Sequence, residues 1–408
     1  MLMNRPAINA VFTPRGASVN RGMYIERPQL EKELARALAG ALHAIIYGES
    51  GNGKSWLYKK LIDDLQWCAF VANCANAPRV GSLTQEIVNV ATPSGAASLQ
   101  GYSESKGVEF GGTLEHKKNY RVRASEPLLG AFQNIRATAG DQSAVLVLDN
   151  LESIFDSPKL MEELGNIITL LDDSRYAQYR VKILIVGVPS GVIEYFSKAP
   201  NLRTVANRLQ EISEVGGLTE DQCNVLTRRG LINQLHVEIK PVDFEEWQDH
   251  IFAVTLGIPQ RVHEYCEQLA YIAEDQDWKG SLTQLDRADQ AWLRIGLRES
   301  YSAIEALMNE RETKAGRRNQ VLYALGRMPS RTFISARVED VLRNHFPRST
   351  FGVALAIGQI MVELEKEGGI IRRTPKGDAF YFSDPRYAMA IRTMLKTDSE
   401  EKVFKVDL

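Results

Sequence analysis

Residues 48–55 have the types and the spacing of a phosphate-binding loop, and they read Gly48, Glu49, Ser50, Gly51, Asn52, Gly53, Lys54 and Ser55. Glycines let a backbone wrap closely around phosphate groups, while successive N–H groups and a helix N-terminus point at the anion. Lys54 is placed to reach the β- and γ-phosphates, and the Ser55 hydroxyl is placed to ligate Mg²⁺. The loop therefore predicts a site for a nucleoside triphosphate, ATP, together with Mg²⁺.

A second group of polar residues follows the apolar run 144–148. Asp149 ends this run, where a carboxylate can serve the magnesium side of the nucleotide. The alternative is an aspartate that caps the next helix. A hydrolytic water needs a general base, and Asn150 cannot serve as one because it carries a carboxamide. Glu152 is therefore the predicted base, with a solvent-facing loop residue as the alternative.

Three more residues could complete a hydrolytic site. Ser190 follows the apolar run 181–187 and either places a hydroxyl near the γ-phosphate or begins the next helix. Arg203 and Arg208 precede the last apolar run. An arginine there could reach the ATP of a neighbouring subunit and stabilise transition-state charge, a role worth ~10³–10⁵ in rate. The alternative for these arginines is an ordinary surface ion pair.

The scaffold that must position these residues can also be predicted. Short apolar runs alternate with helical patterns, which is typical of an α/β domain whose parallel sheet is covered on both faces. The five expected strands are 43–47, 68–73, 144–148, 181–187 and 209–215. The interval 92–124 is too long for an ordinary connection. It predicts either a basic hairpin that contacts DNA or a partner, or a flexible surface insertion.

Helical patterns dominate from residue 218 onward, so we expect three parts. Residues 1–216 would form the nucleotide-binding domain, including an N-terminal arm and the insertion. Residues 217–285 would form a small helical lid. Residues 286–408 would begin with one long helix, 287–308, and continue as three helices closed by a two-stranded ribbon, the pattern of a winged helix.

Composition limits the class of protein. The 408 residues fit two or three domains at ~100–200 residues each. The chain is 44% hydrophobic and 25% charged with a net charge of −2, which argues against a uniformly basic nucleic-acid coat. No apolar run is long enough to cross a membrane. The four cysteines lack a zinc-ligand spacing, so they read as core residues of a cytoplasmic protein.

Taken together, the order of motifs resembles the AAA+ ATPases, and within them the origin-recognition and replication-initiator branch with its bacterial relatives. Residues 48–55 are similar to the Walker A motif of that family, and residues 145–149 are similar to its Walker B motif. The stretch 12–27 looks like the segment that borders the adenine pocket, which implies that Tyr24 and Ile25 contact the nucleotide.

The same resemblance assigns roles to three polar residues. It places Ser190 at sensor 1, Arg208 at the arginine finger and Arg261, in the stretch 257–261, at sensor 2. Arg261 would then come from the helical lid to the γ-phosphate, and ATP would lie at the interface between subunits of a homo-oligomer. Similar ATPases also occur among signal-transduction ATPases, transposition regulators and bacterial antiphage systems.

Two departures from the family pattern favour a slow switch over a fast motor. The family usually has glutamate directly after the Walker B aspartate, where this chain has Asn150. Sensor 1 is usually a longer polar residue than Ser190. Rapid hydrolysis would therefore depend on Glu152.

Three functions remain open at this point. The first is an oligomeric switch on DNA, favoured by eleven basic against six acidic residues in 290–350 and by the wing residues Arg372, Arg373 and Lys376. The second is a regulator of a protein effector such as a nuclease or a transposase, favoured by the mostly apolar helix expected at 351–366. The third is a nucleotide sensor without turnover.

Overall fold

The computed structural model describes residues 5–92, 126–187, 191–199, 202–309 and 316–408. The chain divides into two compact units. One unit is Glu26–Gly216, and the other combines Met1–Ile25 with Gly217–Leu408.

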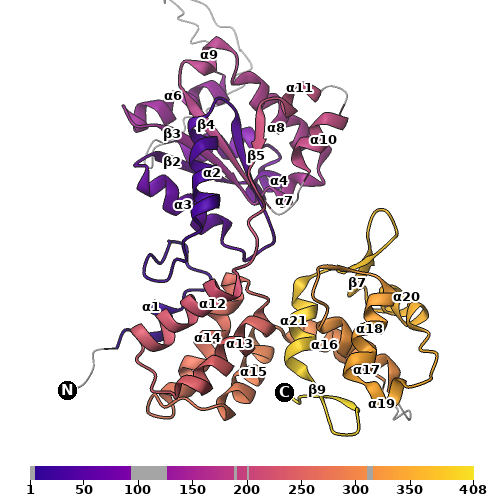
Figure 1. The fold of residues 1–408 in the computed structure, drawn as a ribbon. Coiled ribbons are helices and arrows are strands. Elements are labelled where there is room, and N and C mark those ends of the chain that lie inside the picture. The colour runs from indigo at the N-terminus through magenta and orange to yellow at the C-terminus, as the bar shows by residue number, and fades with distance from the viewer. Residues whose placement is uncertain (1–4, 93–125, 188–190, 200–201, 310–315) are drawn as a thin grey trace, which may run out of the picture. The chain divides into compact units, whose positions relative to one another are not determined.

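Unit Glu26–Gly216 is built on a five-stranded sheet in which every neighbouring pair is parallel (Figure 1). In spatial order the strands are β2 (Cys68–Asn73), β3 (Ala144–Asp149), β4 (Val181–Gly187), β1 (His43–Tyr47) and β5 (Leu209–Glu211). The predicted five-stranded parallel sheet is confirmed. Because β4 lies between β1 and β3, the strands that carry the phosphate loop and Asp149 are not adjacent.

Alternating side chains on these strands build two apolar cores, one on each face of the sheet. Ala44 and Ile46 point into one core, with α2 (Pro28–Ala39) and α3 (Lys54–Asp64) packed against it. Ile45 points into the other core. That second face is covered by helices that include α5 (Leu83–Ala91), α6 (Pro127–Ala139), α8 (Pro158–Leu170) and α10 (Val192–Lys198).

Shorter segments complete this unit between the main helices. They are η1 (Cys74–Asn76), α4 (Ala77–Val80), α7 (Glu152–Phe155), α9 (Ser174–Ala177) and α11 (Arg203–Ala206). The short helix α7 begins three positions after Asp149, and Asn150 and Leu151 lie between it and β3.

The second unit begins with the N-terminal arm and a bundle of helices. Its elements are α1 (Ile8–Val11), α12 (Glu220–Thr227), the π-helical η2 (Arg228–Gln234), α13 (Pro241–Thr255), α14 (Pro259–Glu274) and α15 (Thr283–Ile295). The arm was expected with the nucleotide-binding domain, but Phe12 and Met23 are buried in the core of this bundle instead. Gly230 permits this packing, because a Cβ at that position would lie 2.4 Å from the Phe12 ring.

The expected long helix 287–308 is interrupted. It forms α15 and a separate α16 (Arg298–Leu307), with the chain leaving helical geometry at Leu297. A Cβ at Gly296 would lie 2.8 Å from the indole of Trp292. The backbone therefore packs directly on that ring at the point where the helix breaks, and only glycine allows this approach. Periodicity alone gave no sign of this break.

The remaining segments form an antiparallel three-stranded sheet with helices around it. They are α17 (Arg317–Gly326), β6 (Thr332–Phe333), α18 (Ser335–His345), α19 (Pro347–Thr350), α20 (Ile357–Glu367), β7 (Ile371–Arg373), β8 (Phe380–Phe382), α21 (Pro385–Met394), β9 (Leu395–Thr397) and β10 (Val403–Lys405). The sheet order β6-β8-β7 is compatible with the predicted winged helix. One apolar core joins this region to the helical bundle, so the expected lid and C-terminal part form a single compact unit.

Two expectations about environment can be compared with the described residues. Among them, no helix has both the length and the apolar character that crossing a bilayer requires. The four cysteines are free thiols, and Cys74, Cys223 and Cys266 are buried. This matches their interpretation as core residues.

Candidate nucleotide site

The phosphate loop connects β1 to α3 and depends on three glycines with positive φ. The φ angles are 148° at Gly48, 86° at Gly51 and 86° at Gly53. A Cβ on Gly48 would lie 2.4 Å from the carbonyl oxygen of Val215, so the loop passes that backbone at a distance only glycine allows. Gly53 precedes α3 without a side-chain cap, which leaves the helix N-terminus for an anion.

Lys54 lies over this loop. Its ammonium donates to the carbonyl oxygens of Gly48 at 2.7 Å and Glu49 at 3.0 Å. Burial lowers the pKa of Lys54, while the negative charges of Glu152, Asp149 and Glu49 act in the opposite direction. The structure therefore brings the two predicted carboxylates of the second motif into the electrostatic environment of the loop lysine.

Asp149 ends β3 with both carboxylate oxygens hydrogen-bonded. Its Oδ2 accepts from the hydroxyl of Tyr58 at 3.0 Å, and its Oδ1 accepts from the backbone N–H of Asn150 at 2.9 Å. Tyr58 belongs to α3, so this bond joins Asp149 to the helix that follows the phosphate loop. Together with the Ser55 hydroxyl, the carboxylate offers the oxygen ligands that Mg²⁺ prefers.

Asn150 is turned away from the loop. It has a φ of 59°, a left-handed conformation that asparagine tolerates better than most residues, and its amide donates to Asn73 Oδ1 at 2.9 Å. Glu152 begins α7 and is exposed. A Cβ on Gly187 would lie 3.4 Å from Glu152 Oε2, which places this carboxylate against the end of β4, beside β1.

Asn52 fixes the loop from within. Its side chain is fully buried, and Nδ2 donates to the carbonyl oxygen of Val215 at 2.9 Å. Its Oδ1 has no hydrogen-bond partner among the described residues. Val215 in turn donates its N–H to Tyr47 at 2.9 Å, so the loop and the end of this unit share one hydrogen-bonded junction.

Arg208 lies in the same unit, just before β5. Its Nε donates to Asp172 at 2.6 Å, and its NH1 donates to the carbonyl oxygen of Thr204 at 2.6 Å. Arg203 is exposed on α11. Ser190 lies outside the described residues, as does 93–124 of the expected insertion.

Tyr24, Ile25 and Arg261 belong to the other compact unit, so their contact with nucleotide stays a prediction. Tyr24 and Ile25 are nearly buried, with 8% and 9% of their surface exposed. Arg261 lies in the first turn of α14, where its NH1 pairs with Glu264 at 2.7 Å. The guanidinium is thus held by its own helix.

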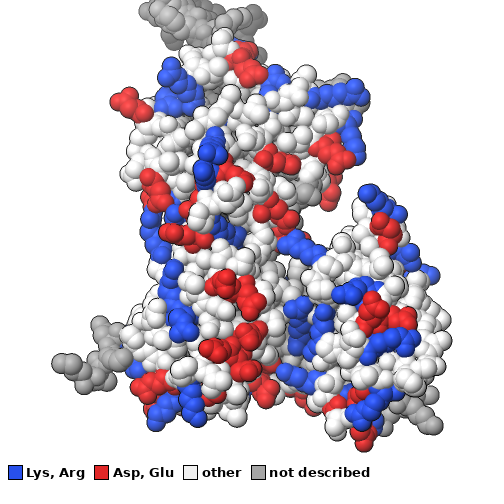
Figure 2. Space-filling model, viewed as in Figure 1, with Lys and Arg blue, Asp and Glu red and all other residues white. Residues whose placement is uncertain are grey.

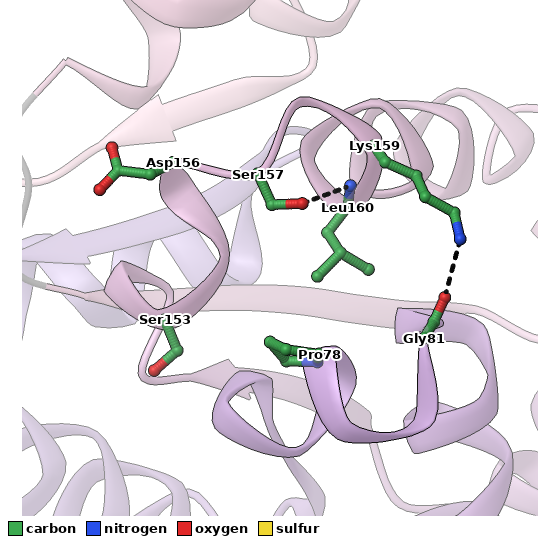
Figure 3. Close-up of a pocket in the computed structure, with 7 residues that line it drawn as sticks. All are labelled: Pro78, Gly81, Ser153, Asp156, Ser157, Lys159 and Leu160. Atoms are coloured by element: carbon green, nitrogen blue, oxygen red, sulfur yellow. Dashed lines mark hydrogen bonds between the residues drawn. The ribbon is translucent and has the colours of Figure 1, made fainter.

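An open hollow of about 450 Å³ lies between α4 and α7 (Figure 3). Two of its polar groups are used inside the protein: Lys159 donates to the Gly81 carbonyl at 3.3 Å, and Ser157 accepts from the Leu160 N–H at 3.5 Å. We assign no ligand to it.

Sequence reasoning missed two residues of the site. Tyr58 stands four residues after Lys54, one helical turn further along α3, and this spacing could have drawn attention to it. Asn73 ends β2, and only the sheet order brings it to Asn150. Its pairing with a residue 77 positions away leaves no local signal.

Comparisons with known proteins bear on the fold that carries this site. Residues 37–196 match the family described as the AAA domain. The Walker-type ATPase PABY2304 of Pyrococcus abyssi is similar in structure, with a TM-score of 0.53 at 14% identity, covering 91% of this chain and 97% of that one. At that identity the likeness shows a shared fold. No curated protein matches the sequence.

Two further solved structures are similar at lower scores. For Cdc6p of Pyrobaculum aerophilum the TM-score is 0.45 at 16% identity, covering 94% of this chain and 97% of that one. For the ORC1 protein of Aeropyrum pernix, solved in complex with DNA, the TM-score is 0.45 at 15% identity, covering 95% of each chain.

Proposed function

We propose, from the AAA+ P-loop fold of Glu26–Gly216, that this chain is a slowly hydrolysing ATPase that acts as an oligomeric, nucleotide-controlled switch. The observation that carries the proposal is geometric: Lys54 lies over the glycine loop and donates to the carbonyls of Gly48 and Glu49, and Asp149 is bonded to Tyr58 of the helix that follows the loop. Asp149 and Glu152 follow β3, and Glu49 follows β1, yet all three act on the same ammonium group. A phosphate chain on the loop would lie within this set of charges.

Each residue has a distinct role in the proposed reaction. Lys54 binds the β- and γ-phosphates, and Ser55 and Asp149 hold the metal. When bound, Mg²⁺ supplies positive charge that neutralises the phosphates. Glu152 accepts a proton from the attacking water.

Slow turnover follows from the loop after β3. The carboxamide of Asn150 is directed to Asn73 and supplies no base. Glu152 comes from a helix of four residues, α7, and is exposed, so water has access to the carboxylate. This arrangement favours a long-lived ATP state over rapid cycling.

The two arginines that would read the γ-phosphate are both paired with carboxylates. Arg208 bonds to Asp172 and Arg261 bonds to Glu264. To act as arginine finger and as sensor 2, each must exchange its carboxylate for phosphate. We propose that these exchanges accompany assembly of a homo-oligomer on ATP, and that the protein is cytoplasmic.

DNA is the first candidate for the controlled partner. Arg294, Arg298, Arg372 and Lys376 are exposed on the C-terminal region, where they could neutralise phosphates. On the side that Figure 2 shows, basic and acidic side chains are interleaved there. Several arginines form ion pairs within the protein, among them Arg318 with Glu363 and Glu367, Arg337 with Asp340, Arg343 with Glu339, Arg348 with Glu401 and Arg373 with Glu365.

A protein effector is the second candidate, and one observation favours it. Helix α20, which stands where a winged helix would read a groove, carries Glu363, Glu365 and Glu367. These carboxylates pair with Arg318 and Arg373, so they occupy basic side chains that DNA phosphates would otherwise bind. Between α19 and α20, Phe351 and Val353 are 87% and 48% exposed, and apolar side chains suit a protein contact better than a phosphate.

Binding to a mixed-sequence duplex at two salt concentrations tests the choice. Neutralisation of about four phosphates predicts that the logarithm of the binding constant falls with the logarithm of salt concentration at a slope of about −3.6. Binding that is absent at low salt, or that does not change with salt, contradicts the DNA proposal and leaves the protein effector.

A further inference from the structure

Tyr58 connects the phosphate-loop helix to the carboxylate proposed for magnesium. Its side chain is fully buried, one turn of α3 beyond Lys54. The hydroxyl donates to Asp149 Oδ2 at 3.0 Å.

The other carboxylate oxygen of Asp149 is fixed from the opposite side. Oδ1 accepts from the N–H of Asn150, whose backbone is left-handed and whose amide bonds to Asn73 at 2.9 Å. The orientation of the carboxylate is thus set by two donors, of which only Tyr58 comes from the helix that also carries Ser55.

We infer that Tyr58 is a positioning residue that orients the Asp149 carboxylate for Mg²⁺ and couples it to the phosphate-loop helix. The inference rests on the proposed function, because it takes Asp149 as the metal-side acid. Side chains that hydrogen-bond to metal ligands fix the ligands in place, and their loss weakens metal affinity by about 10- to 100-fold. Tyr58 contacts the Asp149 carboxylate through one hydrogen bond, from its hydroxyl, and a phenylalanine would lack that bond.

The test is Tyr58→Phe, which keeps the buried ring and removes the donor. Affinity for a fluorescent ATP analogue is measured in EDTA and across a Mg²⁺ titration. We expect unchanged affinity in EDTA and about 10- to 100-fold more Mg²⁺ for half-maximal enhancement of binding. A matched control is Tyr176→Phe, since Tyr176 is also buried and donates to a carboxylate, Glu126, at 2.7 Å.

Three outcomes overturn the inference. They are a wild-type Mg²⁺ requirement in Tyr58→Phe, an equal shift in both variants, or a loss of affinity in EDTA, which would indicate a general structural role. If the wild-type protein itself binds no ATP analogue at any Mg²⁺ concentration, the proposed function fails first. Because the inference rests on that function, this result overturns both, whereas the three outcomes above overturn the inference alone.

Discussion

The buried amide of Asn52 donates a 2.9 Å hydrogen bond to the carbonyl oxygen of Val215, which binds the phosphate loop to the last residues of its compact unit. The same carbonyl lies close enough to Gly48 to exclude a Cβ there. Movement of the loop on phosphate binding would therefore displace the backbone at Val215, two residues before the chain enters the second unit.

Replacing Asn52 with alanine tests this junction. The change leaves the Val215 carbonyl buried without its donor, which costs about 1–3 kcal/mol. We expect a lower free energy of unfolding by that amount and weaker ATP binding, measured by denaturant titration and by equilibrium binding. Asn89→Ala on α5 is the control, because its bond to Gln85 is exposed. Equal stability of both variants would contradict a role for the junction.

Glu152→Gln tests the general base. The amide keeps the size of the side chain but cannot accept the proton, so we expect phosphate release to fall by about 10²–10⁴-fold with ATP binding retained. Asp156→Asn is the matched control, since Asp156 is the residue at the other end of the same short helix and its carboxylate is exposed. Unchanged turnover in Glu152→Gln removes Glu152 from this role.

Arg208→Ala tests whether the site is shared between subunits. We expect turnover to fall by about 10³-fold or more while ATP binding persists. Mixing this variant with Lys54→Ala should restore part of the turnover, because a Lys54→Ala subunit can donate its intact Arg208 to a neighbour. Arg175→Ala removes a comparable surface ion pair, with Asp173, and should leave turnover unchanged. No recovery on mixing would argue against an arginine acting across an interface.

His263 makes a pH prediction for the second unit. Its Nδ1 accepts from the N–H of Thr13, and burial lowers the pKa of His263 to about 4 from its ordinary 6.5. Between pH 6.5 and pH 4, His263 is therefore protonated in the unfolded chain but neutral in the folded chain. The free energy of unfolding has its full value above pH 6.5 and falls toward pH 4 by about 1.4 kcal/mol per pH unit from this group.

The check is denaturant unfolding of wild type and His263→Gln between pH 7.5 and pH 4.5. Glutamine does not titrate, so the variant should lose this part of the pH dependence. Parallel curves for the two proteins would show that His263 does not supply it.

Much of the fold followed from local patterns. The phosphate loop and all five strands were predictable because each depends on consecutive residues: the loop on a glycine-rich motif after an apolar run, and each strand on a short apolar run. Asp149 was predictable for the same reason, as the first polar residue after a buried strand. The roles of the site residues in catalysis stay predictions.

What escaped sequence reasoning depends on distant contacts. The break of the long helix at Gly296 comes from packing on Trp292. The N-terminal arm belongs to the second unit because its apolar side chains are buried in the core of the helical bundle. The pairing of Asn150 with Asn73 requires the strand order, because β2 and β3 are separated by a long stretch of chain. Such tertiary contacts override periodicity without leaving a mark in the local sequence.

Equilibrium binding of Mg²⁺-ATP to wild type and to Lys54→Ala tests the central claim most directly. Lys32→Ala, an exposed lysine on α2, is the control for loss of one positive charge. The account predicts saturable binding by wild type and Lys32→Ala and none by Lys54→Ala, since the ammonium over the loop is the group that meets the phosphates. Normal ATP affinity in Lys54→Ala would contradict the assignment of the site.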